Sequence, residues 1–444
     1  MSKTRFSILI SCFLVFPMMA SIAKSDTVAA VEGTAVARYI NLQLRDTTKI
    51  LKPARIAFDA GNVAEARKLL EAATAGSGYL PHHDVQLALW FFSAGRKADG
   101  IRTMELVAMT EASRPDVRYL FAEIARGEGR YFDAWTHALV GERTEPRKRW
   151  SDEYAKHLQT LIVASKGKTA DARGDWQRSR SIHTSMRGQG DENLSTDLAL
   201  GRASFHLGQP ENAEQHFRRA ATRKGGAKLV PELVMAALYE KKGETEKTES
   251  WFQAGEKAQS DNAERIRLEY VRWLLRQNRA DDAKAQASKQ RPSEARLRDF
   301  QYMIAMSERM KGNFGSSEKI LEALHVQNAT NFQVANQLAL VLIESKDQGK
   351  QARALLLATR NLKAAPKAKD AITTLAWVKH RLGDTTEAEQ LFDLVLRGGQ
   401  ASRDTAYYVA NVKRALKKQS EADLLLGAAK KSNGEFFNLH RVDK

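Results

Sequence analysis

The chain has 444 residues, of which 70 are Lys or Arg and 53 are Asp or Glu, so its formal net charge at pH 7 is +17. Only 9 prolines and 27 glycines interrupt it, and this scarcity of helix breakers favours a helical fold over a sheet-rich or low-complexity one. The single cysteine, Cys12, excludes a disulfide within the chain.

The N-terminal residues 1–23 are typical of a secretory signal peptide, with Lys3 and Arg5 as the basic region and an apolar stretch over 6–20. That stretch, about 15 residues, is shorter than the roughly 20 needed to span a bilayer. We therefore predict a mature chain that starts at Lys24 and has no transmembrane segment. It would be periplasmic or secreted, with association with the outer membrane as a further option. Signal cleavage would also remove the only cysteine.

Residues 24–46 are predicted to form a short helical lead-in to a repetitive body, 47–430. The predicted helix-ending turns of this body are Gly61, Gly95, Gly129, Gly174, Gly208, Gly243, Asn278, Gly312, Asp347, Gly383 and Lys417. They recur at steps of 34 to 36 residues, apart from one step of 45 after Gly129. The longer step predicts an insertion of about 11 residues near 146–160.

Small residues stand at fixed positions around these turns. Seven residues before the turn they are Ala54, Ala88, Ala122, Gly167, Gly201, Ala236, Ala305, Ala376 and Ala410. Five residues after the turn they are Ala66, Gly100, Ala134, Ser179, Ala213, Thr248, Ala283, Ser317, Ala352, Ala388 and Ala422. Small residues at both places let two helices approach closely, while larger apolar side chains fill the space around them.

This spacing resembles that of the tetratricopeptide repeat family. The clearest unit runs from Leu200 and Gly201 through Gly208 to Ala213 and Phe217. The resemblance extends over about 11 units. It implies an all-α, right-handed solenoid of helical hairpins over the whole body, followed by a polar C-terminal tail at 431–444.

No residue constellation indicates catalysis. Lys168 and Thr169 follow Gly167, but Ile162 stands where a phosphate-binding loop requires its first glycine. The adjacent pair His82-His83 lacks the spacing of a metal-binding helix, so loop or groove lining is favoured over metal binding. We therefore predict a protein that is not an enzyme, without cofactor, catalytic site or metal site.

The resemblance implies that the first helix of each hairpin lines a concave groove that binds a peptide or a partner protein. Six basic residues share this predicted position: Arg202, Lys241, Arg265, Arg272, Arg276 and Arg309. Arginine pairs bidentately with carboxylates, so they are candidates for binding an acidic segment or polymer. Glu240 and Glu308 lie among them, so an ordinary solvated surface is the alternative.

The leading functional hypothesis is an exported scaffold for protein–protein interactions in cell-envelope or exopolysaccharide assembly. The segment Val334–Leu394 also resembles repeat units of proteins that take part in bacterial exopolysaccharide export. The alternative is direct binding of an anionic glycan in the basic groove, since the mature charge of 17 − 2 = +15 favours acidic ligands. Export argues against nucleic acid as a partner.

Overall fold

In the computed structural model, the described residues are 47–111, 114–146, 148–190, 192–258, 261–397, 399 and 401–442. This part of the chain forms 23 helices and no strands. None of these helices is both long and apolar enough to cross a bilayer. The predicted signal peptide, 1–23, and the predicted lead-in, 24–46, lie outside the described residues.

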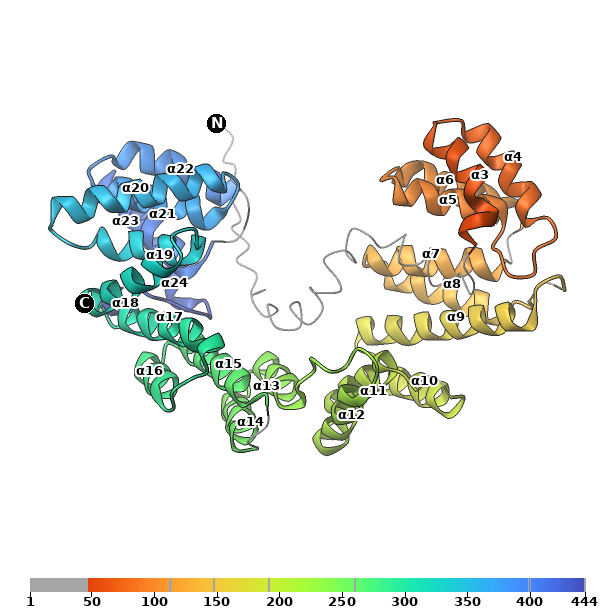
Figure 1. Cartoon of the computed structure of the whole chain (residues 1–444), viewed down its shortest axis with the longest axis horizontal. Helices are drawn as coiled ribbons and strands as arrows, with labels where there is room; N and C mark the ends of the chain where they lie inside the picture. The colour runs from red at the N-terminus through yellow and green to blue at the C-terminus, as the bar shows by residue number, and fades with distance from the viewer. Residues whose placement is uncertain are drawn as a thin grey trace. The chain divides into compact units, whose positions relative to one another are not determined.

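The helices belong to two compact units, an N-terminal unit from Thr47 to Leu238 and a C-terminal unit from Tyr239 to Val442. Helix α13 (Pro231–Lys242) runs across the boundary between them. The other helices of the N-terminal unit are α3 (Thr48–Asp59), α4 (Val63–Thr74), α5 (His83–Ser93), α6 (Lys97–Thr110), α7 (Pro115–Gly127), α8 (Tyr131–Arg143), α9 (Asp152–Arg173), α10 (Trp176–Gly188), α11 (Leu194–His206) and α12 (Pro210–Thr222) (Figure 1).

The C-terminal unit continues the same alternation of short helices (Figure 1). Its helices are α14 (Thr245–Lys257), α15 (Ala263–Arg276), α16 (Ala280–Ser288), α17 (Glu294–Met310), α18 (Phe314–Gln327), α19 (Phe332–Leu342), α20 (Gln348–Ala364), α21 (Lys369–Arg381), α22 (Thr385–Arg397), α23 (Arg403–Ala415), α24 (Gln419–Lys431) and α25 (Leu439–Val442).

Consecutive helices pack against each other as hairpins. The N-terminal unit contains the hairpins α3–α4, α5–α6, α7–α8, α9–α10 and α11–α12. The C-terminal unit contains α15–α16, α17–α18, α19–α20, α21–α22 and α23–α24. First helices of successive hairpins also touch, as α7 touches α9 and α19 touches α21. The all-α hairpin repeat predicted from the sequence is therefore confirmed.

The turn inside each hairpin uses a left-handed backbone conformation. Every predicted turn position except Asp347 has a positive φ, including Asn278 at 59° and Lys417 at 60°. These two are the only residues other than glycine with positive φ in the described part of the chain. Glycine reaches this region without steric cost, and asparagine tolerates it better than most residues, which explains why the series is so rich in glycine.

The turn predicted at Asp347 is wrong by a few residues. Asp347 has φ of −72° and caps α20, with its side chain accepting a hydrogen bond from the backbone N–H of Lys350 at 3.0 Å. Ala352, predicted to be the small packing residue, is exposed, whereas Ala354 is fully buried. The repeat register slips by two residues here because the longer turn between α19 and α20 does without a left-handed glycine.

Small residues allow the close helix approach that the sequence predicted. A Cβ atom added to Gly201 on α11 would lie 2.5 Å from the ring of Phe217 on α12. Both residues are buried, and Phe217 is completely inaccessible to solvent. The glycine is therefore what lets the aromatic ring lie against the α11 backbone.

The extra residues between Gly129 and Gly174 form the connection from Arg143 to Asp152 and lengthen α9 to 22 residues. Trp150 in this connection is 7% exposed and packs edge-on against Tyr154, with ring centroids 5.2 Å apart. The connection is anchored where the backbone N–H of Ser151 donates to the carbonyl of Gly78 at 2.8 Å. The insertion thus completes the core of the N-terminal unit.

Candidate functional site on the C-terminal unit

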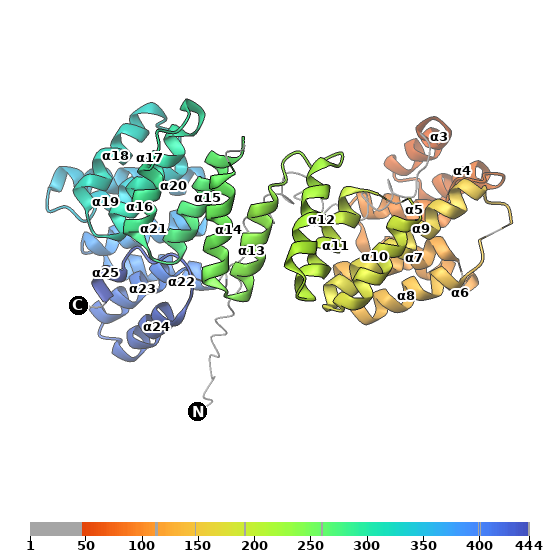
Figure 2. The ribbon, with the colours of Figure 1, turned by 90° about the horizontal axis from the view of Figure 1, so that it is seen from below.

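The last described residues, Gly434–Val442, fold back onto the C-terminal unit; we call them the tail segment. The sequence predicts a polar tail at 431–444, but Phe436 is fully buried and Phe437 is only 9% exposed. Figure 2 shows α25, the helix that ends the tail segment, on the C-terminal unit, and the ring of His440 lies 5.9 Å from that of Phe314 on α18. The tail therefore contacts helices more than a hundred residues earlier in the chain.

The backbone of the tail segment is held by side chains from two distant hairpins. Asn278, at the turn after α15, donates through Nδ2 to the carbonyl of Gly434 at 3.4 Å. Its Oδ1 accepts from the N–H of Phe436 at 3.0 Å. At the start of α23, the Asp404 carboxylate accepts from the N–H groups of Phe437 and Asn438, both at 3.1 Å. These contacts satisfy backbone groups of residues 434–438, which precede α25 and belong to no helix.

Two aromatic side chains anchor the same segment. The ring of Phe436 lies edge-on to Tyr407 of α23, with centroids 6.2 Å apart, and under the guanidinium of Arg403 at 4.7 Å. The ring of Phe437 lies under the guanidinium of Arg309 of α17 at 4.8 Å. Burial of two phenylalanine rings supplies most of the apolar contact of the tail.

The far end of the tail is fixed by polar contacts. The Nδ1 atom of His440 lies 3.2 Å from the Met310 carbonyl, which fixes it as the donor because a carbonyl only accepts. Arg441 donates to Glu344, after α19, at 2.7 Å, and Arg381 of α21 donates to the same carboxylate oxygen at 2.7 Å. Burial of Glu344 opposes ionisation, but Arg441 and Arg381 prevail and lower the pKa of Glu344.

We call the residues that hold the tail the tail site. It consists of Asn278, Arg309, Met310, Glu344, Arg403, Asp404 and Tyr407. All of these lie on first helices of hairpins or directly after them. The contacts come from backbone recognition, aromatic burial and ion pairing together, which is how a folded surface recognises an extended peptide.

The predicted basic residues fall into two groups. Arg202 belongs to the N-terminal unit, where it pairs with Asp171 at 3.0 Å. Arg272, Arg276 and Arg309 belong to the C-terminal unit, and all three act on the carboxylate of Glu435 in the tail segment. Glu435 is solvent-exposed, yet lost hydration raises the pKa of its carboxyl, and the three arginines oppose that rise.

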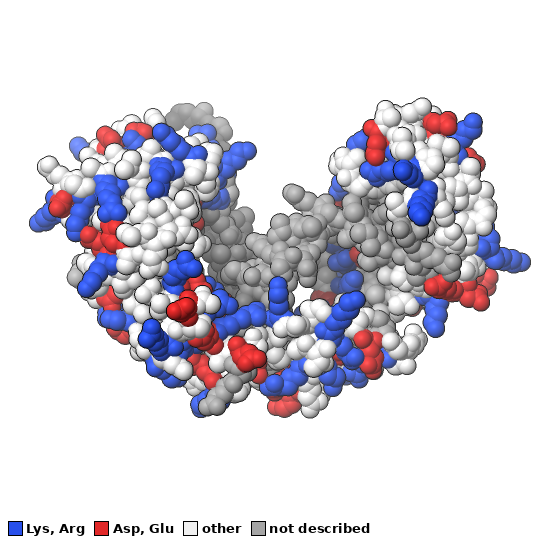
Figure 3. All heavy atoms as spheres, viewed as in Figure 1, with Lys and Arg blue, Asp and Glu red and all other residues white. Residues whose placement is uncertain are grey.

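Two of the basic side chains of the C-terminal unit are also engaged by acids of the repeat itself. Arg276 donates to both carboxylate oxygens of Glu240, at 3.1 and 3.2 Å, and Arg272 pairs with Glu269 at 2.5 Å. Lys241 and Arg265 likewise each have a partner. Figure 3 shows Lys and Arg interspersed with Asp and Glu on the visible face. Acidic side chains therefore lie among the basic residues of the C-terminal unit.

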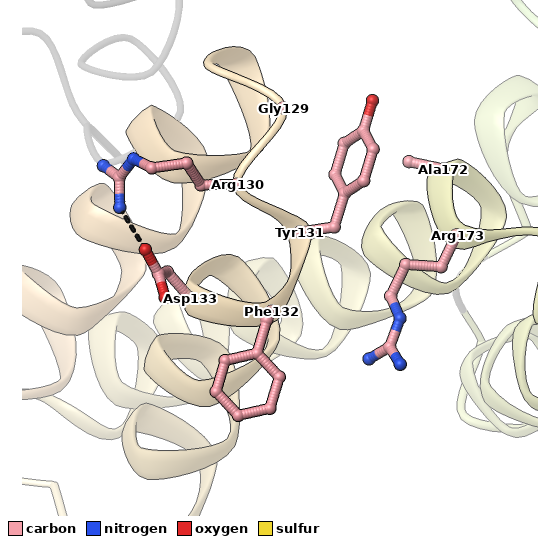
Figure 4. Close-up of a pocket in the computed structure, with 7 residues that line it drawn as sticks. All are labelled: Gly129, Arg130, Tyr131, Phe132, Asp133, Ala172 and Arg173. Atoms are coloured by element: carbon pink, nitrogen blue, oxygen red, sulfur yellow. Dashed lines mark hydrogen bonds and ion pairs between the residues drawn. The ribbon is translucent and has the colours of Figure 1, made fainter.

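The N-terminal unit has two further features that could be binding sites. An open depression in the N-terminal unit is lined by Gly129, Arg130, Tyr131, Phe132, Asp133, Ala172 and Arg173. Tyr131 and Phe132 point in different directions, and the Arg130–Asp133 pair stands beside them (Figure 4). Phe132 is 75% exposed, so these side chains converge on no enclosed space.

The second feature is a group of potential metal ligands, His82, His83 and Asp84, whose ligand atoms lie within 4.8 Å of one another. Asp84 already accepts from Arg67 at 2.7 Å, and the Nδ1 atom of His82 accepts from the Asp84 N–H at 3.2 Å. Burial and the neighbouring His83 and Arg114 lower the pKa of His82 to about 4. Existing partners and nearby cations disfavour a metal ion, and we assign none.

The sequence did not predict the tail site. Asn278 was expected only as a turn residue, because its second role depends on a segment 156 residues later. Asp404 carries no motif at all. The one available signal was the adjacent pair Phe436-Phe437 in an otherwise polar C-terminal stretch, since two neighbouring large apolar residues are seldom left in water.

Comparisons with known proteins identify no family for this chain. No protein-family model matches the chain, and no curated protein matches it. Among solved structures, the chain is similar to MamA MSR-1, with a TM-score of 0.27, 16% identity, and coverage of 38% of this chain and 97% of that one. The values for MamA AMB-1 are 0.27, 17%, 37% and 96%.

The TPR domain of P58(IPK) is also similar, with a TM-score of 0.27 and 13% identity over 84% of this chain and 99% of that one. TM-scores of 0.27 do not establish a fold or a function for this chain. The TPR-like fold therefore rests on the hairpin spacing, the left-handed turns and the close-packed small residues described above.

Proposed function

We propose that this protein is an exported helical-repeat scaffold that binds partner proteins during assembly of the cell envelope or of exopolysaccharide. One observation carries the protein-binding part. The tail site holds the non-helical residues 434–438 through their backbone and two aromatic side chains, so the first-helix surface has the chemistry to bind a peptide. Export and the envelope role are supported by the signal-like residues 1–23 and by the resemblance of Val334–Leu394.

Affinity capture tests the proposal. The chain from Lys24 onward is immobilised and exposed to envelope extract of its own cells at low and moderate salt, and both protein and glycan are analysed. Recovery of a defined protein at both salt concentrations is expected. Absence of any protein at either concentration would sink the scaffold proposal.

Direct binding of an anionic glycan is the second candidate, and the observation that favours it is the net charge of +17. Pairing of Arg276 with Glu240 and of Arg272 with Glu269 weighs against it. A polymer held by charge should be lost steeply as salt rises, because exposed charges are screened within about 8 Å at physiological ionic strength. Charge reversal at Arg265, Arg272 and Arg276 should abolish glycan capture if this candidate is correct.

Export has its own test. The protein isolated from the envelope fraction should begin at Lys24 when its N-terminal residue is determined. A chain that retains Met1 and fractionates with cytoplasmic markers would contradict export while leaving the binding of partner proteins untouched.

A further inference from the structure

The tail segment differs from the rest of the C-terminal unit in how it is attached. It follows α24, which ends at Lys431, and no hairpin of the described residues comes after it, so its departure from the surface would interrupt none of the described hairpins. The last hairpin also has packing of its own, since α23 and α24 contact each other and both helices contain buried small or apolar residues, Val409, Ala410, Ala422 and Ala429. Loss of the tail would therefore expose a formed surface and leave the hairpins in place.

The tail also presents a short recognisable pattern. The charges of Arg272, Arg276 and Arg309 act on Glu435, the rings of Phe436 and Phe437 follow it, and Asn438 comes next. Asn438 donates through Nδ2 to Asp404 at 2.5 Å. The two rings and the amide thus each meet a matching group on the tail site, and Glu435 lies in the field of nearby arginines. Any extended segment with the same order of side chains can make the same contacts.

We infer that the tail site is a docking surface for an extended segment of a partner protein in which an acidic residue precedes two aromatic residues, and that the chain's own tail fills this surface until such a partner displaces it. The inference rests on the proposed function, and it adds the chemistry of the partner and the competition that controls access. A linker as short as that between Lys431 and Gly434 keeps the tail at an effective concentration of about millimolar, so the chain at rest excludes weak ligands.

The test uses a labelled synthetic peptide of residues 433–442 and the chain from Lys24 onward. In one variant, Phe436→Ala and Phe437→Ala together release the tail and leave the tail site intact. The peptide should bind this variant at least about tenfold more tightly than it binds the wild type, because the tail no longer competes. Circular dichroism and thermal unfolding confirm that the hairpins remain folded.

Matched changes locate the binding. Asn278→Gly, added to the tail-release variant, keeps the left-handed turn because glycine adopts positive φ freely, but it removes both hydrogen bonds to the peptide backbone. Peptide affinity should fall by about tenfold. Peptides with Glu435→Lys, or with both phenylalanines replaced by alanine, should bind the tail-release variant more weakly than the original peptide.

Two results would overturn the inference. One is equal peptide affinity for the wild type and the tail-release variant, which would mean that the tail does not occupy the binding surface. The other is no binding to a tail-release variant that is folded, which would make the tail a permanent part of the unit.

The wild type and the tail-release variant, when both are used in the envelope capture, test the two proposals separately. Peptide competition without capture of any protein would remove the scaffold function and leave the internal competition standing. Equal capture of a defined protein by the wild type and the tail-release variant, without peptide binding, would do the reverse. More of that protein on the tail-release variant, displaced by the free peptide, would support both.

Discussion

Each of the two units packs a segment that is not part of a repeat hairpin, and the two segments are attached differently. In the N-terminal unit, the connection that carries Trp150 lies between α8 and α9 and is fixed at both ends. In the C-terminal unit, the tail segment follows α24, and no further hairpin of the described residues comes after it. Both use an aromatic ring beside an arginine, Trp150 with Arg114 at 5.7 Å and Phe437 with Arg309 at 4.8 Å. Similar contacts therefore hold an internal connection in one unit and the tail segment in the other.

Removal of Trp150 should have the largest effect. Trp150→Ala deletes a buried ring against Tyr154 and leaves Arg114, whose side chain is 1% exposed, without its aromatic neighbour. The N-terminal unit should lose about 3 to 5 kcal/mol of stability. Hydrogen exchange followed by mass spectrometry should show lost protection in α7–α9 and unchanged protection in α21–α24.

Trp135→Ala is the control for this prediction. Trp135 is half-buried and has Lys166 and Arg178 over its ring at 5.4 and 5.0 Å. Its loss should cost about 1 to 2 kcal/mol. An equal loss of protection for both tryptophan variants would contradict the structural role given to the insertion.

The ion pair at the end of the tail should depend on pH. Because the folded-state pKa of Glu344 lies below its ordinary 4.5, its stabilising contribution is present above that value and is lost as pH falls through the depressed one. Glu344→Gln should cost about 2 kcal/mol at pH 7, since Arg441 and Arg381 lose their acceptor. The difference in Tm between wild type and variant should shrink as pH falls below about 4.5.

Calorimetry from pH 3 to 7 measures that difference. A constant gap in Tm over the whole range would mean that the charge of Glu344 does not stabilise the folded chain. The N-terminal unit offers a useful internal reference, because none of the residues that pair with Glu344 belongs to it.

The smallest predicted changes in stability come from replacing two helical glycines by alanine, and they have opposite signs. Gly201→Ala in α11 would place a Cβ atom 2.5 Å from the Phe217 ring, and overpacking should cost about 1 to 3 kcal/mol. Gly427→Ala in α24 meets nothing within 4 Å, and the better helix propensity of alanine should stabilise by about 0.5 to 1 kcal/mol. Thermal unfolding of both variants gives the signs directly. A stabilised Gly201→Ala variant would contradict the close approach of α11 and α12.

The sequence predicted the parts of the fold that depend on local backbone and on near neighbours. Gly61, Gly95 and the later turn positions have positive φ because a hairpin of this length needs a left-handed residue at that place. The prediction failed at Asp347, where the turn has a different length and Ala354 replaces Ala352 in the core. A fixed repeat period cannot reveal such a slip, because it assigns the same packing position in every unit. The slip changes which residue faces the neighbouring helix.

The site was less predictable than the fold. Arg272, Arg276 and Arg309 lie on first helices, and their pairing with Glu269, Glu240 and the tail depends on distances that no spacing rule supplies. The backbone contacts of Asn278 and Asp404 carry no side-chain signature in the tail, since a peptide N–H is the same in every residue but proline.

Asn278 occupies a position that is glycine at most other hairpin turns of this chain. Glycine would satisfy the turn but not the tail, so the asparagine is needed only while the tail segment exists. Over evolutionary time the two features should be inherited together: a descendant chain that loses the Phe436-Phe437 pair is free to return residue 278 to glycine. A correlated change at residue 278 and at the Phe436-Phe437 pair would indicate that the tail no longer binds its own site in that lineage.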